Sequence, residues 1–181
     1  ILSPDGKHWF LSVQHGKQNF VVIDGVEQPV YNCIHKMVLS PDGRILAYCA
    51  KKENGKKCVV LNGVEGKEYD GVLGLKFSRS NKLAYRAMKN SELCVVIDTE
   101  EERWYDWVSC FEWYGNHYVY LARIGDHQCV VLDGTELGWY QKVTEINFEV
   151  TLRLVYKYKD QESEDFVRKD IETKIVHEDE P

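Results

Sequence analysis

Phe20-Val-Val-Ile-Asp24 is the stretch that decides the fold, because its pattern returns along the whole chain. The further copies are Cys58-Val-Val-Leu-Asn62, Cys94-Val-Val-Ile-Asp98, Cys129-Val-Val-Leu-Asp133 and the weaker Phe166-Val-Arg-Lys-Asp170. They begin at intervals of 38, 36, 35 and 37 residues. An apolar β-branched run that ends in Asp or Asn is typical of a strand leading into a tight turn. A period of this length predicts repeated units that bury their faces against one another.

Other residue types keep the same period. Seven residues after each Asp or Asn stands an aromatic residue, replaced by histidine in the fifth copy: Tyr31, Tyr69, Tyr105, Tyr140 and His177. Three residues beyond each of these tyrosines stands an aliphatic residue: Ile34, Val72, Val108 and Val143. Another column is formed by Leu11, Tyr48, Tyr85, Tyr120 and Tyr156. Several columns that move together exclude a chance similarity between short segments.

Each unit contains four short strand signals. In the second unit these are Met37–Leu39, Arg44–Ala50, Lys57–Leu61 and the region Glu68–Val72. Ser40-Pro-Asp-Gly43 supplies a turn between the first two, since Pro presets φ and Asp and Gly favour the bend. Four antiparallel strands in about 36–38 residues are typical of a propeller blade.

The expected fold class is therefore all-β: a β-propeller of about five four-stranded antiparallel blades. Its repeats are expected at 1–35, 36–73, 74–109, 110–144 and 145–181, in one propeller that occupies 1–181. Two alternatives stay open, a five-bladed ring that closes on itself and a part of a larger propeller. Because Ile1 aligns with Val38, inside a first strand, we expect a fragment of a longer chain.

Composition excludes some classes of function. The net charge is −6, from 23 basic and 29 acidic residues, which argues against a basic footprint for nucleic acid. No apolar run reaches the roughly 18 residues of a membrane span, and no secretory leader is visible.

The cysteines predict free thiols. Cys58, Cys94 and Cys129 hold the same position in successive repeats. Neighbouring blades lie about 10 Å apart, whereas a disulfide needs Cα atoms within about 7 Å. They are expected to be small buried hydrophobic residues, which favours a reducing compartment and a cytoplasmic location. A periplasmic location is the alternative, because the native N-terminus is not shown.

The turns carry a resemblance to a known family. Ser3-Pro-Asp-Gly6 and Ser40-Pro-Asp-Gly43 resemble the signature of TolB-like propeller repeats, which are related in architecture to WD40-like repeats, and the Val-Val-Ile-Asp-Gly pattern resembles a bacterial subtype. The resemblance covers nearly the whole chain, but the turn signature fades at Ser78-Arg-Ser-Asn81 and in the two later repeats. It implies a binding platform with no fixed activity.

No residue pattern indicates catalysis, and no cofactor or metal is expected. Serine nucleophile elbows and phosphate-binding glycine loops are absent from the sequence, and the six histidines have no metal-ligand spacing. The Asp and Asn residues that close the third strands are explained better by turn chemistry than by a ring of metal ligands. The tyrosine column is expected to pack between blades, with a stacking platform for sugars or bases as the alternative.

Candidate partner-binding residues lie in the loops after the fourth strands, which meet the loops between second and third strands at one mouth of a propeller. They are Asn32, His35, Asp70, Asp106, Trp107, Gln141 and Lys142. Trp107 is the large aromatic residue among polar neighbours, which suits an interface anchor, although burial against the next blade would also explain it.

The main functional hypothesis is a non-catalytic scaffold that binds a protein or peptide partner. The first alternative is a regulatory or gating propeller domain of a larger hydrolase or peptidase, whose partner is another domain of the same parent chain. The second alternative is a propeller that binds a small ligand or a glycan between its blades.

Overall fold

The computed structural model describes residues 1–149, 153–159 and 164–170, and every regular element among them is a β-strand. The first two sheets contain β1 (Phe10–His15), β2 (Gln18–Ile23) and β3 (Val26–Glu27), then β4 (Cys33–Leu39), β5 (Leu46–Lys51), β6 (Lys57–Leu61) and β7 (Val64–Tyr69). The third contains β8 (Gly71–Phe77), β9 (Leu83–Lys89), β10 (Glu92–Ile97) and β11 (Glu100–Glu101). The last two contain β12 (Trp107–Tyr114), β13 (His117–Ile124), β14 (His127–Leu132) and β15 (Thr135–Tyr140), then β16 (Lys142–Glu149), β17 (Arg153–Lys159) and β18 (Glu164–Asp170).

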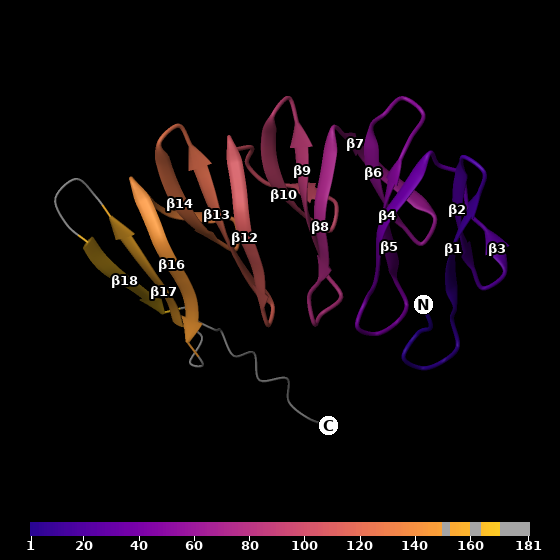
Figure 1. The fold of residues 1–181 in the computed structure, drawn as a ribbon. Coiled ribbons are helices and arrows are strands. Elements are labelled where there is room, and N and C mark those ends of the chain that lie inside the picture. The colour runs from indigo at the N-terminus through magenta and orange to yellow at the C-terminus, as the bar shows by residue number, and fades with distance from the viewer. Residues whose placement is uncertain (150–152, 160–163, 171–181) are drawn as a thin grey trace, which may run out of the picture.

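The described residues thus form five sheets, each an antiparallel meander in which neighbours in sequence are neighbours in space. Figure 1 shows the sheets side by side in chain order, from β1–β3 at one end of the row to β16–β18 at the other. In the first sheet, Leu2 pairs with Trp9 as Leu39 pairs with Leu46 in the second. The predicted all-β architecture of consecutive blades is confirmed. His177, which the sequence aligned with the tyrosine column, lies outside the described residues.

In the first four sheets, the residue of the Asp and Asn column forms the turn that follows the third strand of the repeat. Asp98 has a positive φ of 56°, and its Oδ1 accepts a hydrogen bond of 2.9 Å from the backbone N–H of Leu83. Asn62 does the same for Leu46 at 2.8 Å, and Asp24 and Asp133 repeat the contact in their own sheets. Asp and Asn tolerate this left-handed conformation and supply the acceptor. The turn interpretation of this column is confirmed for these four residues.

The Ser-Pro-Asp-Gly turns are closed by their serine and aspartate. Ser40 Oγ donates to Asp42 at 2.5 Å and accepts the backbone N–H of Ile45 at 2.9 Å. The serine is retained where the signature fades, because Ser78 Oγ still accepts the N–H of Lys82 at 3.0 Å. Gly43 has a φ of 76°, and a Cβ there would lie 2.7 Å from the Cδ of Pro4. The turns of the first two blades are therefore in close contact.

The strand boundaries correct part of the prediction. Lys57–Leu61 was predicted as the third strand and is observed as β6. The predicted first strand Met37–Leu39 was too short, because β4 begins at Cys33, and the fourth strand ends at Tyr69, so Val72 belongs to β8. For β4 the cause is a β-bulge near Lys36, which has a φ of 38° and interrupts the alternation of side chains.

The core consists of layers between consecutive sheets. Tyr69 of the second sheet packs edge-on against Tyr85 of the third, with ring centroids 6.3 Å apart. The pairs Tyr31–Tyr48 and Tyr105–Tyr120 repeat this geometry at 6.2 Å. The predicted packing of the tyrosine column between blades is thereby confirmed for these three pairs.

The cysteines of the repeat lie in the same layers. Cys58, Cys94 and Cys129 are fully buried and free, as predicted. Among the described residues, no helix has the length and apolar character needed to cross a membrane.

Candidate binding site at the bulged first strands

The first strands of three neighbouring sheets are bulged at the same height. The pairing register shifts between His35 and Met37 in β4, between Leu73 and Lys76 in β8, and between Ser109 and Glu112 in β12. A bulge leaves one residue outside the ladder and redirects its side chain, and bulges are common beside functional sites. β4 and β8 are also in direct contact. The repeated bulge therefore places irregular backbone from successive blades on one side of the row.

A pocket of about 470 Å³ lies at these bulges, and we call it the bulge pocket. Its lining combines apolar and charged side chains: Lys36, Gly74, Leu75, Lys76, Tyr85, Arg86, Ser109, Phe111 and Glu112. Leu75 and Tyr85 are buried, and Phe111 is half-buried, so part of the wall is dry and apolar. Three cationic side chains face one carboxylate, which leaves an excess of positive charge.

Arg86 has the most constrained position among these cations. Its Nη1 donates to the backbone carbonyl of Val108 at 3.0 Å, which anchors the guanidinium between two sheets. Gly74 lies beside the other end of the group, where a Cβ would be 3.6 Å from Nη2. Lys76 is paired with Glu112, whereas Lys36 is exposed. Among the described residues, Nε and Nη2 of Arg86 donate no hydrogen bond. A guanidinium fixed in this way is suited to bind a carboxylate through two parallel hydrogen bonds.

The candidate residues predicted at the mouth lie along one edge of the row. Asp70 and Asp106 have equivalent roles: Asp70 Oδ2 accepts the N–H of Asn90 at 2.9 Å, and Asp106 Oδ2 accepts that of Gly125 at 2.7 Å. The loops after the fourth strands thus meet the hairpins between second and third strands, as predicted. The hydrogen bond from Lys56, at 2.5 Å, lowers the pKa of Asp70. Both aspartates hold neighbouring loops together.

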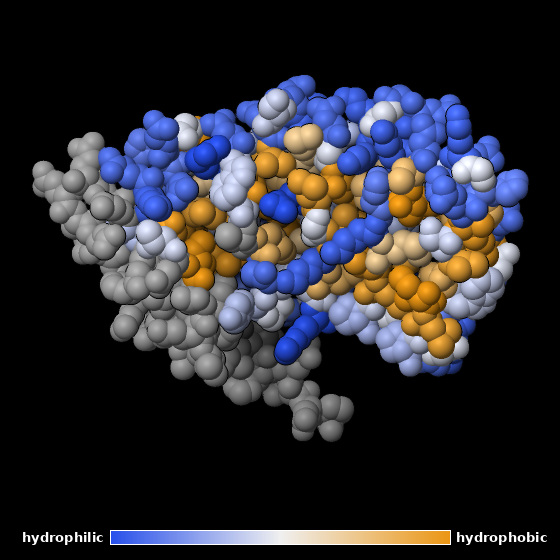
Figure 2. Space-filling view, viewed as in Figure 1, coloured by the Kyte–Doolittle hydropathy of each residue, from blue (hydrophilic) through white to orange (hydrophobic). Residues whose placement is uncertain are grey.

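Trp107 is half-buried and packs against the core cluster between the fourth and fifth sheets. The guanidinium carbon of Arg123 lies 5.8 Å from the centre of one of its rings, within the range of a cation–π contact. The remaining candidates are exposed: Asn32, His35, Gln141 and Lys142. Figure 2 shows this edge, with the β9–β10 and β13–β14 hairpins, as mainly hydrophilic. Partner binding by the seven residues stays a prediction.

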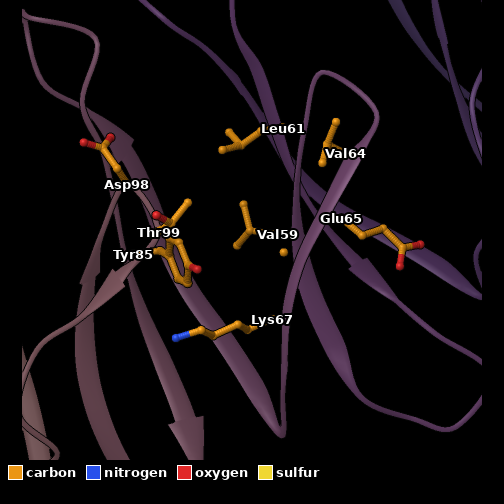
Figure 3. A pocket seen from close by; sticks show the side chains of 9 residues that line it. Val59, Leu61, Val64, Glu65, Lys67, Tyr85, Asp98 and Thr99 are labelled. Carbon is orange, nitrogen blue, oxygen red and sulfur yellow. The ribbon is translucent and has the colours of Figure 1, made fainter.

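A second pocket, of about 490 Å³, lies between the second and third sheets. In Figure 3, Val59 and Leu61 of one blade face Tyr85, Asp98 and Thr99 of the next. Lys67 extends across the opening and pairs with Glu101 at 3.3 Å. This apolar gap has the position expected for a small ligand held between blades, although its lining offers few polar groups to orient one.

The bulge pocket was missed from the sequence, but it left a signal. Arg86 occupies a strand position whose counterparts in neighbouring blades are Cys49 and Leu121. A charged residue between two apolar counterparts favours a polar function at that place, and the first and fifth repeats also have polar residues there, Ser12 and Lys157. The bulges themselves gave only weak signals, such as Gly74 inside an apolar strand.

Comparison with known proteins identifies the fold. No protein-family model matches the chain, and no curated protein matches it. Among solved structures, the chain is similar to the β-propeller domain of the Trilobed protease from Pyrococcus furiosus, a domain described as having an open velcro topology. The TM-score is 0.53 at 16% identity, over 90% of this chain and 65% of that chain.

Two other structures are less similar. An acylaminoacyl peptidase from Pyrococcus horikoshii gives a TM-score of 0.47 at 13% identity, over 90% of this chain and 36% of that one. TolB from Acinetobacter baumannii gives 0.43 at 12% identity, over 86% of this chain and 47% of that one. The chain thus spans less than two thirds of each of these three structures.

The sheet topology and the likeness to the Trilobed protease domain define the class of fold: the chain is a β-propeller. This confirms the architecture predicted from the repeat. TolB, whose repeats the Ser-Pro-Asp-Gly turns resemble, is among the structures matched.

Proposed function

We propose that the chain is a protein-interaction module that binds the carboxylate of a peptide partner in the bulge pocket. The observation that carries this proposal is the position of Arg86, fixed by Val108 and flanked by a glycine that leaves its free donors uncovered. A carboxylate would accept from Nε and Nη2 of Arg86, while Lys36 adds positive charge. Leu75, Tyr85 and Phe111 would receive an apolar side chain next to it. A peptide with an apolar C-terminal residue combines these two features.

The exposed mouth residues would extend this surface along the row. Four of the mouth residues are exposed, do not pack in the core and can offer polar contacts: Asn32, His35, Gln141 and Lys142. Asp70, Asp106 and Trp107 would act on a partner mainly by fixing the loops that carry such contacts. The free buried cysteines support a reducing compartment, and we extend the proposal to a cytoplasmic location.

Binding can be tested with a fluorescent peptide pool that has randomised C-terminal residues, prepared as free acids and as amides. The free acids are expected to bind more tightly. Arg86→Gln is expected to weaken binding about 10- to 100-fold, the value of a hydrogen bond to a charged group. Lys36→Gln tests the same site without disturbing a packed side chain, and Lys82→Gln, an exposed lysine between β8 and β9, is the matched control.

Equal binding of acids and amides would reject the carboxylate site. Loss of binding in Lys82→Gln to the same extent as in Lys36→Gln would show that only general charge matters. Thermal unfolding of each variant separates loss of the site from loss of the fold.

The second candidate function is that of a non-catalytic domain within a larger hydrolase. The similarity to a protease propeller supports this alternative. A fluorophosphonate probe for reactive serines and a fluorogenic peptide substrate test the non-catalytic part of the proposal. The chain is expected to remain unlabelled and inactive, and specific labelling that heat denaturation abolishes would overturn it.

A further inference from the structure

One face of the first sheet leaves open to solvent, fully or in part, the positions that the next three sheets bury. Phe10, Val21 and Ile23 pack on the second sheet. Because side chains alternate along a strand, the neighbouring residues point to the opposite face. That face is formed by the cross-strand pairs Leu11–Val22 and Val13–Phe20, and we call it the sheet-1 face.

The same four positions form the buried back of each of the next three sheets. Their cross-strand pairs have the same register as those of the first sheet. The equivalent residues are Tyr48, Val60, Ala50 and Cys58, then Tyr85, Val96, Ala87 and Cys94, then Tyr120, Val131, Ala122 and Cys129. The side chain in the tyrosine position is 0%, 6% and 1% exposed in these sheets, whereas Leu11 is 52% exposed. In each case the residues that cover this face belong to the preceding sheet. They lie on its front, which we define as the side that corresponds to Phe10, Val21 and Ile23 in the first sheet.

A polar contact accompanies each of these interfaces. The hydroxyl of Tyr31 donates to Glu65 at 2.9 Å, that of Tyr69 to Glu101 at 2.8 Å, and that of Tyr105 to Glu136 at 3.0 Å. Every tyrosine belongs to one blade and every glutamate to the next, three residues after the Asp or Asn of the turn.

Glu27 occupies this glutamate position in the first sheet. Its carboxylate is exposed and has no hydrogen-bond or ion-pair partner among the residues that the structure describes. The sheet-1 face therefore combines an apolar surface with a carboxylate. The three interfaces between neighbouring blades described above use the same combination.

We propose that the sheet-1 face receives a further blade of the same repeat, supplied by the protein's own chain. This blade packs an aliphatic front against Leu11, Phe20 and Val22, and its tyrosine donates to Glu27. The occupant follows from continuity with the interfaces already present and from the match between a tyrosine donor and an uncovered carboxylate. The proposal does not depend on the bulge pocket or on the function proposed for it.

A chain extended by a second copy of residues 1–37 ahead of Ile1 tests this proposal. The added copy keeps the repeat in register, because Ile1 then follows residue 37 as Val38 does. It would present its own equivalents of Phe10, Val21 and Tyr31 to the sheet-1 face. A cysteine at position 11, introduced as Leu11→Cys, reports burial through its rate of alkylation, measured by peptide mass spectrometry to distinguish it from the native cysteines.

The expected result is alkylation at least about 10-fold slower in the extended chain than in the parent, because a packed site reacts only when it opens. Leu73→Cys, an exposed site on β8, is the matched control and should react equally in both chains. Glu27→Gln should leave the melting temperature of the parent unchanged and lower that of the extended chain by about 2–4 °C.

Three results would overturn the proposal. The first is unchanged alkylation of position 11 in an extended chain whose circular dichroism shows the added strands. The second is an added repeat that stays unfolded on the chain. The third is a concentration-dependent dimer of the parent that Leu11→Lys abolishes, since a second copy would then be the occupant.

Discussion

Tyr69→Phe removes one hydroxyl from the contact between the second and third blades and keeps the ring. Tyr69 is 2% exposed, and its hydroxyl donates to Oε1 of Glu101 at 2.8 Å. A hydrogen bond to a charged group contributes about 1.5–3 kcal/mol. Glu101 is partly open to water and keeps its contact with Lys67 at 3.3 Å, so the lower limit applies. We expect a loss of about 1.5 kcal/mol, or about 3–6 °C in melting temperature for a chain of this size.

Urea unfolding followed by fluorescence measures this loss, and its m-value should not change. A double-mutant cycle with Glu101→Ala isolates the contact: Tyr69→Phe should cost less than about 0.5 kcal/mol when the carboxylate is absent. Glu92→Ala, which removes an exposed carboxylate from β10, is the control for the change in charge. An equal cost of Tyr69→Phe in both backgrounds would refute the reasoning, because the hydroxyl would then act through something other than Glu101.

The same contact predicts a dependence on pH. Burial raises the pKa of Glu101, but the hydrogen bonds from Tyr69 and Lys67 prevail and lower it below its usual value of 4.5. A lowered folded-state pKa stabilises the fold above the usual value, and this stabilisation is lost as the pH falls through the folded-state pKa. The difference between wild type and Tyr69→Phe should therefore shrink in acid. A constant difference down to acid unfolding would contradict this.

Burial raises the pKa of Tyr48 and of Tyr85 to about 12, so their contribution to stability is complete below pH 10 and is lost as the pH rises toward 12. The tyrosinate absorbance of these two residues, obtained as the difference between the wild type and their Phe variants, should appear together with unfolding. Ionisation of either residue near pH 10 in a folded chain would contradict this. Gly43→Ala should lower the free energy of unfolding by about 2 kcal/mol, because this position combines a positive φ with contact to the neighbouring turn. Gly55 also has a positive φ but open space around it, so Gly55→Ala should lower the free energy of unfolding by only about 1 kcal/mol. Denaturant unfolding measures both values. Asp98→Ala should lower the free energy of unfolding by about 2–4 kcal/mol, since it strains the turn and leaves the N–H of Leu83 without its acceptor. Asp98→Asn keeps the side-chain oxygen and should lower it by less than about 0.5 kcal/mol. Equal losses in the two variants would show that this oxygen does not stabilise the turn.

The repeat allowed the blades and their turns to be predicted, because these depend on local chemistry. The strand Lys57–Leu61 and the turn role of Asp98 follow from alternation and from the preferences of Asp for a positive φ. The extent of β4 could not be predicted in this way, since a bulge at Lys36 shifts the alternation by one residue. The alternation of apolar and polar residues along a strand indicates which face of the sheet each side chain occupies. This rule fails at a bulge, where the backbone leaves the hydrogen-bond ladder.

The site was harder to predict for a related reason. The mouth loops were predicted from their place after the fourth strand of each repeat, and the proximity of Asp70 to the β9–β10 hairpin was expected correctly. The bulge pocket depends on contacts between three blades, and no single repeat contains it. The role of Arg86 depends on its anchor, the carbonyl of Val108, which belongs to the next blade.

The order of the tyrosine–glutamate contacts has a consequence for synthesis on the ribosome. Each tyrosine precedes its glutamate in the sequence, by 34, 32 and 31 residues in the three cases. A blade that has just left the exit tunnel thus carries an unpaired donor until the next repeat emerges. The blade made last is always the one whose tyrosine has no glutamate yet. Its exposed face provides the surface on which the next blade packs. Such a chain can fold one repeat at a time in the direction of translation, with no long loop to close at any step.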